Sequence, residues 1–180
     1  RYGEITGDYK SLDTLATFAF EDFKRKKFFL NELEHLFLLA RENDIDVNSF
    51  RGSFAGALGI PQFMPSSWRN FAVDFDNDGK INLLKSPADA IGSIANYLSI
   101  HGWKPNEVSH ARIYPKTNLN PSKFVASSLK AESSVRELAD AGFILDSRLF
   151  PPNLNASLID LPEKDGTVKY WLATQNFFAV

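Results

Sequence analysis

The sequence predicts a mainly helical α+β protein that ends in a small β-containing part. Before residue 142, apolar residues recur at every third or fourth position in several segments, as they do along amphipathic helices. Near the C-terminus, two β-prone runs flank a Lys-Asp-Gly triplet, a pattern typical of a β-hairpin. The 180 residues, 44% of them hydrophobic, can bury a sizeable core, which excludes a disordered chain.

The first helical pattern covers residues 11–41 and is interrupted by a charged stretch at residues 21–27, which predicts two helices. Another helix is expected to begin at Ser86, which is followed by a proline suited to a first helical turn, and to end at Gly102. Between these patterns, residues 52–67 are rich in Gly, Ala and Ser and contain two prolines. We expect short turns and loops there.

The second half of the chain predicts further helix and then the hairpin. Residues 121–141 indicate one or two helices, with Leu129 among the inward-facing residues and Gly142 at the end. The β-prone runs at residues 158–161 and 167–172 then pair around the Lys-Asp-Gly triplet.

Composition excludes several classes of function. Twenty Lys and Arg against 22 Asp and Glu leave a net charge of -2, so the chain lacks the basic field that attracts nucleic acid. Cysteine is absent, which excludes disulfides, thiolate nucleophiles and Cys-ligated metals. No apolar stretch approaches the roughly 20 residues that a membrane-spanning helix needs.

An aspartate-rich segment carries the spacing of an EF-hand calcium loop. Asp74, Asp76 and Asp78 occupy positions one, three and five, and Gly79 supplies the sharp turn at position six. A hard cation needs several oxygens at about 2.3–2.6 Å, and alternate residues of a tight loop point inward. Lys80 fits at position seven because that position binds through its backbone carbonyl.

The segment departs from an ordinary EF-hand at position twelve, where Lys85 replaces the bidentate Glu. Asp89, in the first turn of the following helix, can substitute if the loop is enlarged. The alternative is that the Asp triplet is a solvated turn and Asp89 a first-turn acid favoured by the helix dipole. We favour calcium, in a structural role, because three alternating carboxylates with the glycine in register are a specific signal.

The segment at residues 52–68 is rich in small residues, which let a backbone approach another surface closely. That surface is either a neighbouring helix or a ligand whose hydroxyls and amides meet Ser53 and Gln62. Four aromatic residues offer stacking faces to sugar rings, although each fits a core or rim position equally well. They are Trp68, Tyr97, Trp103 and Trp171.

Longer motifs extend these patterns along nearly the whole chain. They lie at residues 12–18, 32–41, 52–67, 72–74, 89–93, 95–97, 102–103, 170–171 and 176–177. Together they closely resemble the membrane-bound lytic murein transglycosylase B family, glycoside hydrolase family 103.

The resemblance implies a domain organisation. Residues 1–110 are expected to form a lysozyme-like helical catalytic core, with the EF-hand-like calcium loop at residues 74–89. Residues 111–157 are expected to form a helical extension. Residues 158–180 are expected to form a small β-containing segment that packs back on the core.

The resemblance also implies a reaction. Members of the family cleave the β-1,4 bond between N-acetylmuramic acid and N-acetylglucosamine of peptidoglycan without water, because the 6-hydroxyl of the muramic acid attacks the anomeric carbon. The product carries a 1,6-anhydro end. One Glu protonates the leaving oxygen and then accepts the hydroxyl proton, which requires a carboxyl whose pKa is raised by an apolar setting.

Site residues are carried over position by position. Ser53 and Gln62 resemble substrate-binding residues that hydrogen-bond the sugars and their N-acetyl groups, and Tyr97 resembles an active-site tyrosine beside the scissile bond. No organic cofactor is expected. The implied calcium ligands are Asp74, Asp76, Asp78, the carbonyl of Lys80, and Asp89.

The catalytic acid is expected outside the chain. In the family it precedes an Arg, aromatic, Gly triplet with one residue between, and this triplet is Arg1, Tyr2, Gly3, so the Glu is expected two positions before Arg1. Glu4 follows the glycine and would face away from that place on a continuing helix. Glu32 matches a family position and is expected to be a structural partner rather than a catalyst.

The resemblance places the parent protein in the periplasm of a Gram-negative bacterium, with outer-membrane anchoring through a missing N-terminal segment as one arrangement. We expect a monomer that binds peptidoglycan glycan strands. Two alternatives stay open: a peptidoglycan-binding module without catalysis, and a calcium-responsive interaction protein. The second is disfavoured because sensors usually carry paired EF-hands and a Met-rich groove, whereas this sequence has one loop and one Met.

Overall fold

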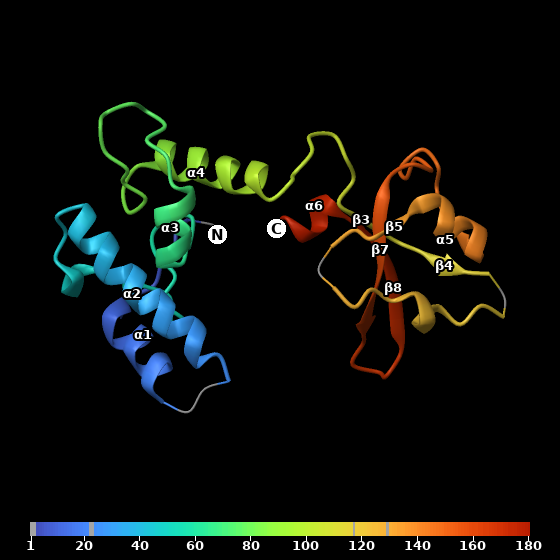
Figure 1. Cartoon of the computed structure of the whole chain (residues 1–180), viewed down its shortest axis with the longest axis horizontal. Helices are drawn as coiled ribbons and strands as arrows, with labels where there is room; N and C mark the ends of the chain where they lie inside the picture. The colour runs from blue at the N-terminus through green and yellow to red at the C-terminus, as the bar shows by residue number, and fades with distance from the viewer. Residues whose placement is uncertain (1–2, 22–23, 117, 129) are drawn as a thin grey trace. The chain divides into compact units, whose positions relative to one another are not determined.

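The computed structural model of the chain contains two compact units, Arg1–Tyr97 and Leu98–Val180 (Figure 1). It describes every residue except 1–2, 22–23, 117 and 129. Each unit has a hydrophobic core of its own.

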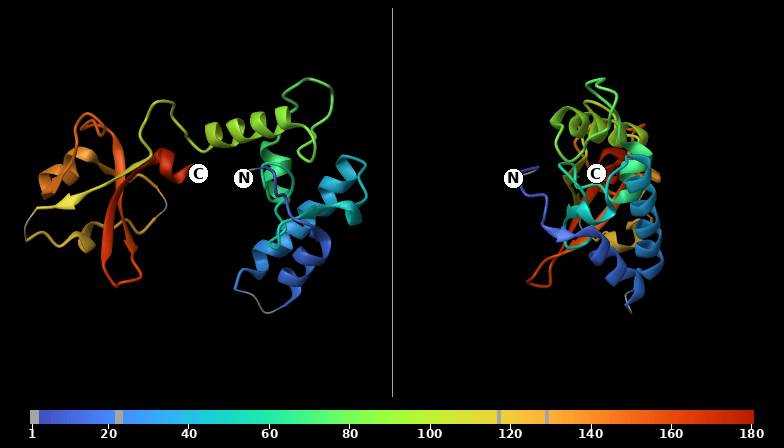
Figure 2. Two further views of the ribbon diagram at one scale, coloured as in Figure 1. Left: turned by 180° about the vertical axis from the view of Figure 1, so that it is seen from behind. Right: turned by 90° about the vertical axis from the view of Figure 1, so that its left-hand side faces the viewer.

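The helices α1 (Ser11–Phe20) and α2 (Lys26–Glu42) of the first unit lie side by side (Figures 1 and 2). Leu15 of α1 and Leu36 of α2 are fully buried, at 0% exposure, because the apolar stripes of the two helices face the same core. The prediction of two helices in residues 11–41 is therefore confirmed.

The first unit has five further elements among the described residues. They are β1 (Tyr9–Lys10), η1 (Val47–Ser49), β2 (Arg51–Gly52), α3 (Pro65–Phe71) and most of α4 (Pro87–Ile100). β1 pairs with β2, and isolated bridges then join Gly52 to Leu58 and Leu58 to Phe63. The predicted turns of residues 52–67 are confirmed, and α4 begins directly after Ser86, as expected.

The second unit is built on a four-stranded antiparallel sheet in the order β3-β8-β7-β5. Its central strands β7 and β8 form the predicted hairpin, which is therefore confirmed. Leu158 and Leu172 pair across it and are 1% and 0% exposed. The elements of this unit are β3 (His110–Arg112), β4 (Tyr114–Pro115), η2 (Pro121–Phe124), β5 (Ser133–Ser134), α5 (Val135–Ala141), β6 (Phe143–Ile144), β7 (Asn155–Pro162), β8 (Val168–Thr174) and α6 (Gln175–Phe178).

The region predicted as one or two helices, residues 121–141, contains η2 and α5 with the short strand β5 between them. Ser134 and Glu137 form a capping box at the start of α5, and Gly142 ends it with φ 109°. The predicted helix end at Gly142 is confirmed. Leu129 lies outside the described residues.

The structure divides the chain differently from the expected organisation. The boundary falls between Tyr97 and Leu98 rather than at residue 110, and residues 111–157 mix strands with helix instead of forming a helical extension. The physical reason is strand pairing, because β3 and β5 join the β7–β8 hairpin in one sheet. The hairpin therefore packs on the core of its own unit.

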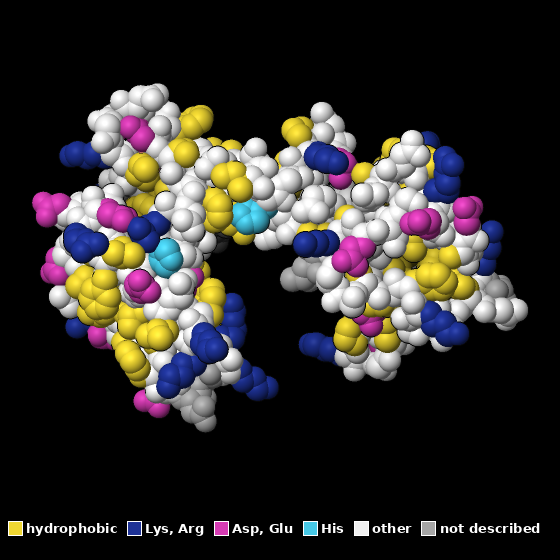
Figure 3. Space-filling view, in the orientation of Figure 1, with side chains coloured by type: hydrophobic (Ala, Val, Ile, Leu, Met, Phe, Trp, Pro, Cys, Tyr) yellow, Lys and Arg dark blue, Asp and Glu magenta, His cyan; other side chains and the backbone are white. Residues whose placement is uncertain are grey.

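The surfaces of both units carry side chains of both signs close to one another (Figure 3), in keeping with the small net charge. Among the helices of the described residues, none combines the length and the apolar character needed to cross a membrane.

Candidate functional site

Three of the predicted metal ligands converge in the first unit. A carboxylate oxygen from each of Asp74, Asp76 and Asp89 lies within 4.8 Å of the other two. Asp89 is buried, at 1% exposure, whereas Asp76 is exposed. Within the described parts of the chain, none of the three forms an ion pair with Lys or Arg. The arrangement therefore gathers negative charge without a cationic side chain to balance it.

The Asp89 carboxylate closes the loop. Its Oδ1 accepts a hydrogen bond from the backbone N–H of Phe75 at 2.9 Å, and its Oδ2 accepts one from Asn82 N–H at 2.8 Å. Burial alone would raise the pKa of this carboxyl, but the N–H donors of Asn82, Phe75 and Asp76 together hold its pKa below the ordinary value. The group is therefore a buried carboxylate that its backbone donors stabilise.

The other loop aspartates organise the turn between these two contacts. Asp74 accepts hydrogen bonds from the backbone N–H groups of Asp78, at 3.2 Å, and Gly79, at 2.9 Å. Gly79 has φ +87°, a conformation that favours glycine, as the sequence predicted for this turn. Asp78 instead accepts from Lys80 N–H at 2.9 Å and lies outside the group of three converging carboxylates. Its role as a ligand, and that of the Lys80 carbonyl, stay predictions.

One polar stripe of α4 holds the chain that leads into this loop. Asp89, Ser93 and Asn96 follow one another at helical spacing of three and four, so they lie on one face. Ser93 Oγ accepts from Val73 N–H at 3.0 Å, and Asn96 Nδ2 donates to the Phe71 carbonyl at 2.8 Å. The three side chains therefore fix the backbone between α3 and the loop against one helix.

The predicted saccharide-binding residues lie in the same unit. Ser53 is partly exposed, and its Oγ accepts hydrogen bonds from the backbone N–H groups of Ala55, at 3.3 Å, and Ala57, at 3.1 Å. This oxygen shapes a tight turn of residues 53–57. Neither of these hydrogen bonds uses its hydroxyl proton.

Gln62 occupies a left-handed backbone conformation, with φ +54°. Its amide nitrogen donates to the carbonyls of Gly59, at 2.9 Å, and Thr6, at 3.0 Å. The amide oxygen is the part of this side chain that remains available as an acceptor among the described residues. Gln62 also ties the N-terminal segment to the small-residue segment, a role that the sequence did not predict.

Tyr97 lies beside the same segment. Its ring contacts those of Phe63, with centroids 5.6 Å apart, and Phe71, with centroids 5.1 Å apart. Phe63 directly follows Gln62, and bridges join Gly52, Leu58 and Phe63. The structure thus gathers the segments that carry Ser53, Gln62 and Tyr97 in one unit, while their part in binding a sugar stays a prediction.

The sequence predicted that Glu32 has a structural role but did not identify Ser66 as the residue it contacts. Glu32 on α2 is 2% exposed, and its carboxylate accepts from Ser66 N–H at 2.9 Å and from Ser66 Oγ at 2.6 Å. Ser66 lies in the first turn of α3, so Glu32 holds that helix against α2. The match of Glu32 to a family position was the available signal.

Trp68 is 3% exposed, which places it in the core rather than on a stacking surface.

The comparison with a protein-family model decides the family. The model described as "Transglycosylase SLT domain" matches residues 1–180, the whole chain. The chain belongs to the transglycosylase SLT domain family. Its fold is accordingly the lysozyme-like, mixed α/β fold of lytic transglycosylases.

Individual relatives of this SLT domain chain support its membership of the family. Membrane-bound lytic murein transglycosylase B of Escherichia coli (strain K12) is 39% identical over 180 residues, which are 100% of this chain and 48% of the relative. The E. coli lytic transglycosylase Slt35, solved in complex with calcium, has a TM-score of 0.77 and 37% identity over 99% of this chain and 55% of its own.

A third relative was solved with a glycopeptide. SltB3 from Pseudomonas aeruginosa, in complex with NAG-anhNAM-pentapeptide, has a TM-score of 0.79 and 28% identity over 99% of this chain and 47% of its own. The SLT domain chain therefore spans about half the length of the relatives it matches.

Replacing Asp89 by Ala is expected to lower the free energy of unfolding of the first unit by about 3 kcal/mol, because the N–H groups of Phe75 and Asn82 lose a charged acceptor. Urea denaturation in the presence of a chelator measures this without any contribution from metal. Asp8→Ala, at an exposed position, is the matched control and should change the value by less than about 0.5 kcal/mol. Equal effects of the two substitutions would contradict the role of Asp89.

Proposed function

We propose that the protein to which this chain belongs is a lytic transglycosylase that cleaves the β-1,4 bond between N-acetylmuramic acid and N-acetylglucosamine in peptidoglycan. The observation that carries the proposal is the match of the SLT domain model to all of residues 1–180. The name of the E. coli relative and the NAG-anhNAM ligand of the Pseudomonas relative support the substrate and the 1,6-anhydro product.

Within this proposal, residues 52–63 and Tyr97 contribute to the floor of the saccharide site. The Gln62 amide oxygen is suited to accept a hydrogen bond from a sugar hydroxyl or an N-acetyl N–H, since both amide protons are used by Gly59 and Thr6. The Ser53 hydroxyl is suited to donate to a sugar oxygen. These groups bind and orient the glycan, and the bond is broken by another residue.

We propose that the catalytic Glu lies two positions before Arg1, as the family resemblance implies. Arg1 and Tyr2 lie outside the described residues. The Glu would donate its proton to the glycosidic oxygen as the bond to the anomeric carbon breaks, and the muramic 6-hydroxyl would then attack that carbon. The hydroxyl proton returns to the carboxylate, so the reaction consumes no water. Glu32 does not suit this task, because Ser66 donates two hydrogen bonds to its buried carboxylate.

The reaction is tested by incubating purified sacculi with the 180-residue chain and with a longer protein that includes the upstream Glu and the downstream sequence. Chromatography and mass spectrometry of the released products should show anhydromuropeptides from the longer protein and none from the chain alone. The longer protein with the upstream Glu replaced by Gln is the matched control and should be inactive. Equal product from the chain alone would refute the placement of the acid, and sacculus binding without product would favour a non-catalytic module.

We further propose that the Asp-rich loop binds calcium in a structural role. The donor set fits a hard cation, since three carboxylates converge without a cationic partner among the described residues. Asp74, Asp76, Asp78, the Lys80 carbonyl and Asp89 would hold the ion. The calcium complex of the E. coli relative supports the same choice of metal.

Calcium should raise the melting temperature of the protein, because an ion that binds only the folded state adds about 2.7 kcal/mol of stability at 100 times its Kd. Differential scanning calorimetry with calcium and with chelator measures the shift. Asp76→Ala should abolish most of it, and Asp8→Ala should leave it intact. A melting temperature that does not respond to calcium in the unmodified protein would rule out a structural site.

The cellular setting follows from the same proposal. We propose that the enzyme acts on the cell wall in the periplasm of a Gram-negative bacterium, as the family resemblance implies, and the name of the E. coli relative supports association with a membrane. We propose that it acts there as a monomer on glycan strands.

A further inference from the structure

The N-terminal segment, residues 3–10, lies against the proposed saccharide segment, residues 52–63. Its one regular element is β1, which pairs with β2, and residues 5–8 belong to neither a helix nor a strand. The path of the N-terminal segment therefore depends on its contacts with the saccharide segment. In the proposed function the catalytic Glu lies at the upstream end of this segment, so the same contacts determine where the acid lies.

One of these contacts joins Gly7 to the peptide bond between Gly52 and Ser53. Gly7 has φ +85°, and a Cβ atom at this position would overlap the Gly52 carbonyl and lie 2.8 Å from the backbone nitrogen of Ser53. A side chain does not fit there, whereas glycine lets the two backbones meet. The second of these backbones carries the Ser53 side chain.

Two further contacts hold the N-terminal segment on the upstream side of Gly7. The amide nitrogen of Gln62 donates to the Thr6 carbonyl at 3.0 Å. Gly3, with φ +79°, lies beside Ile60, and a Cβ atom at Gly3 would be 3.0 Å from Ile60 Cγ2. The chain that leads to the proposed acid is therefore held, contact by contact, against the saccharide segment.

The saccharide segment is also fixed by hydrogen bonds that do not involve the N-terminal segment. Ser53 N–H donates to the Ala57 carbonyl at 2.9 Å, and Ser53 Oγ accepts from Ala57 N–H at 3.1 Å. Ile60 N–H donates at 2.9 Å to the carbonyl of Leu83, a residue with 0% exposure. An added side chain at Gly7 would therefore displace the N-terminal segment rather than the groups proposed to bind sugar.

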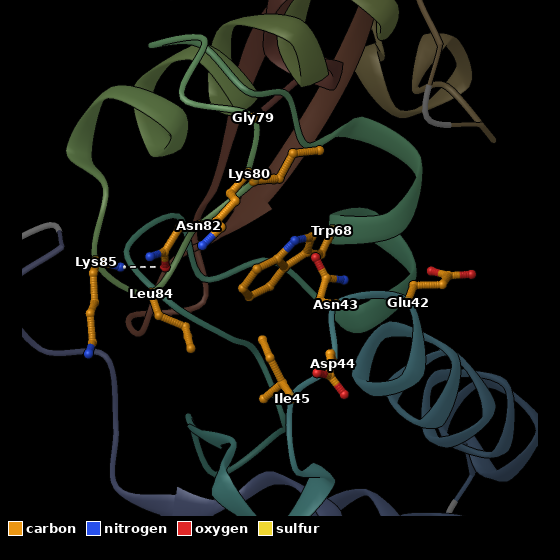
Figure 4. A pocket seen from close by; sticks show the side chains of 11 residues that line it. Glu42, Asn43, Asp44, Ile45, Trp68, Gly79, Lys80, Asn82, Leu84 and Lys85 are labelled. Carbon is orange, nitrogen blue, oxygen red and sulfur yellow. Dashed lines mark hydrogen bonds between the residues drawn. The ribbon is translucent and has the colours of Figure 1, made fainter.

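A cavity of about 750 Å³ opens elsewhere in the same unit, around Trp68, between the turn after α2 and the second half of the Asp-rich loop (Figure 4). None of its lining residues belongs to the N-terminal segment or to the saccharide segment. Acidic residues on one wall offset lysines on the other, so the lining does not single out a charged ligand. Substitutions at Gly7 change no residue of this cavity or of the Asp-rich loop.

We infer that Gly7 is a positioning residue for the catalytic Glu. By letting the two backbones meet, it sets the distance between the acid and a glycan bound at Ser53 and Gln62. The inference rests on the proposed function, which supplies the acid and its place two positions before Arg1. A misplacement of about 1 Å can slow an enzymatic reaction roughly 100-fold. A side chain at Gly7 should therefore slow proton transfer while the glycan stays bound.

The test uses the longer protein that includes the upstream Glu, and compares three glycine-to-alanine variants. Gly7, Gly3 and Gly166 have φ values of +85°, +79° and +84°, so alanine introduces similar backbone strain at each. A Cβ atom meets backbone atoms at Gly7 and the end of a side chain at Gly3. At Gly166, in the β7–β8 turn, nothing lies within 4 Å, so Gly166→Ala is the matched control for strain alone.

Turnover of a soluble NAG–NAM oligomer gives kcat, and calorimetric titration in a background with the upstream Glu replaced by Gln gives Kd and stoichiometry. Gly7→Ala should lower kcat about 10- to 100-fold, Gly3→Ala should lower it less, and Gly166→Ala should leave it unchanged. Full stoichiometry and an unchanged Kd in all three variants establish that each is folded. The pH dependence of kcat reports the ionisation of the acid in the complex, so it should shift in Gly7→Ala and not in Gly166→Ala.

Unchanged kcat in Gly7→Ala, or an equal loss in Gly166→Ala, would overturn the inference. A loss of glycan binding that matches the loss of kcat would also overturn it, because Gly7 would then only support the fold. If Gly7→Ala does not fold, Gly3→Ala decides: lower kcat with intact binding supports the inference, and unchanged kcat refutes it. Absence of anhydro product from the unmodified longer protein would instead refute the proposed function, and the inference with it.

Discussion

The buried carboxylate of Asp89 is the constraint on which the functional part of the first unit depends. A charge with 1% exposure is tolerated only where donors replace the water it has lost, and here backbone N–H groups from both ends of the Asp-rich loop do so. The same two hydrogen bonds bring the loop ends together on α4. The loop is thus closed by a helix residue rather than by its own twelfth position, where Lys85 stands.

This closure has consequences on both faces of the loop. On the inner face it brings the carboxylates of Asp74 and Asp76 to that of Asp89, where their mutual repulsion favours a bound cation. On the outer face it fixes Asn82, whose side-chain and backbone oxygens accept hydrogen bonds from the N–H groups of Lys85 and Ser86. A metal in the loop would therefore stabilise an arrangement of the chain that these hydrogen bonds already hold.

Short sequence patterns predicted the elements that form from residues close together in the chain. The period of apolar residues predicted α1, α2 and α4, and the Lys-Asp-Gly turn predicted the β7–β8 hairpin. The loop spacing also predicted that the carboxylates of Asp74 and Asp76 converge, and Asp89, which the sequence offered as a substitute for position twelve, lies with them. In each of these cases, residues close in sequence determine the outcome.

Contacts between distant segments could not be predicted in this way. Glu32 meets Ser66, and Gln62 meets Thr6, through hydrogen bonds that leave no periodic signal in the sequence. The division at Leu98 was missed because β3 and β5, with three and two residues, are too short to show alternation and become strands only by pairing with the hairpin.

Amide hydrogen exchange tests the central role of Asp89 most directly. The N–H groups of Phe75 and Asn82 donate to its carboxylate. The N–H of Asn77, at the exposed tip of the same loop, donates to no acceptor among the described residues and serves as the reference. Exchange of the Phe75 and Asn82 amides as slow as in the interior of α4, with fast exchange at Asn77, is the result this account predicts. Equally fast exchange at all three positions would contradict it.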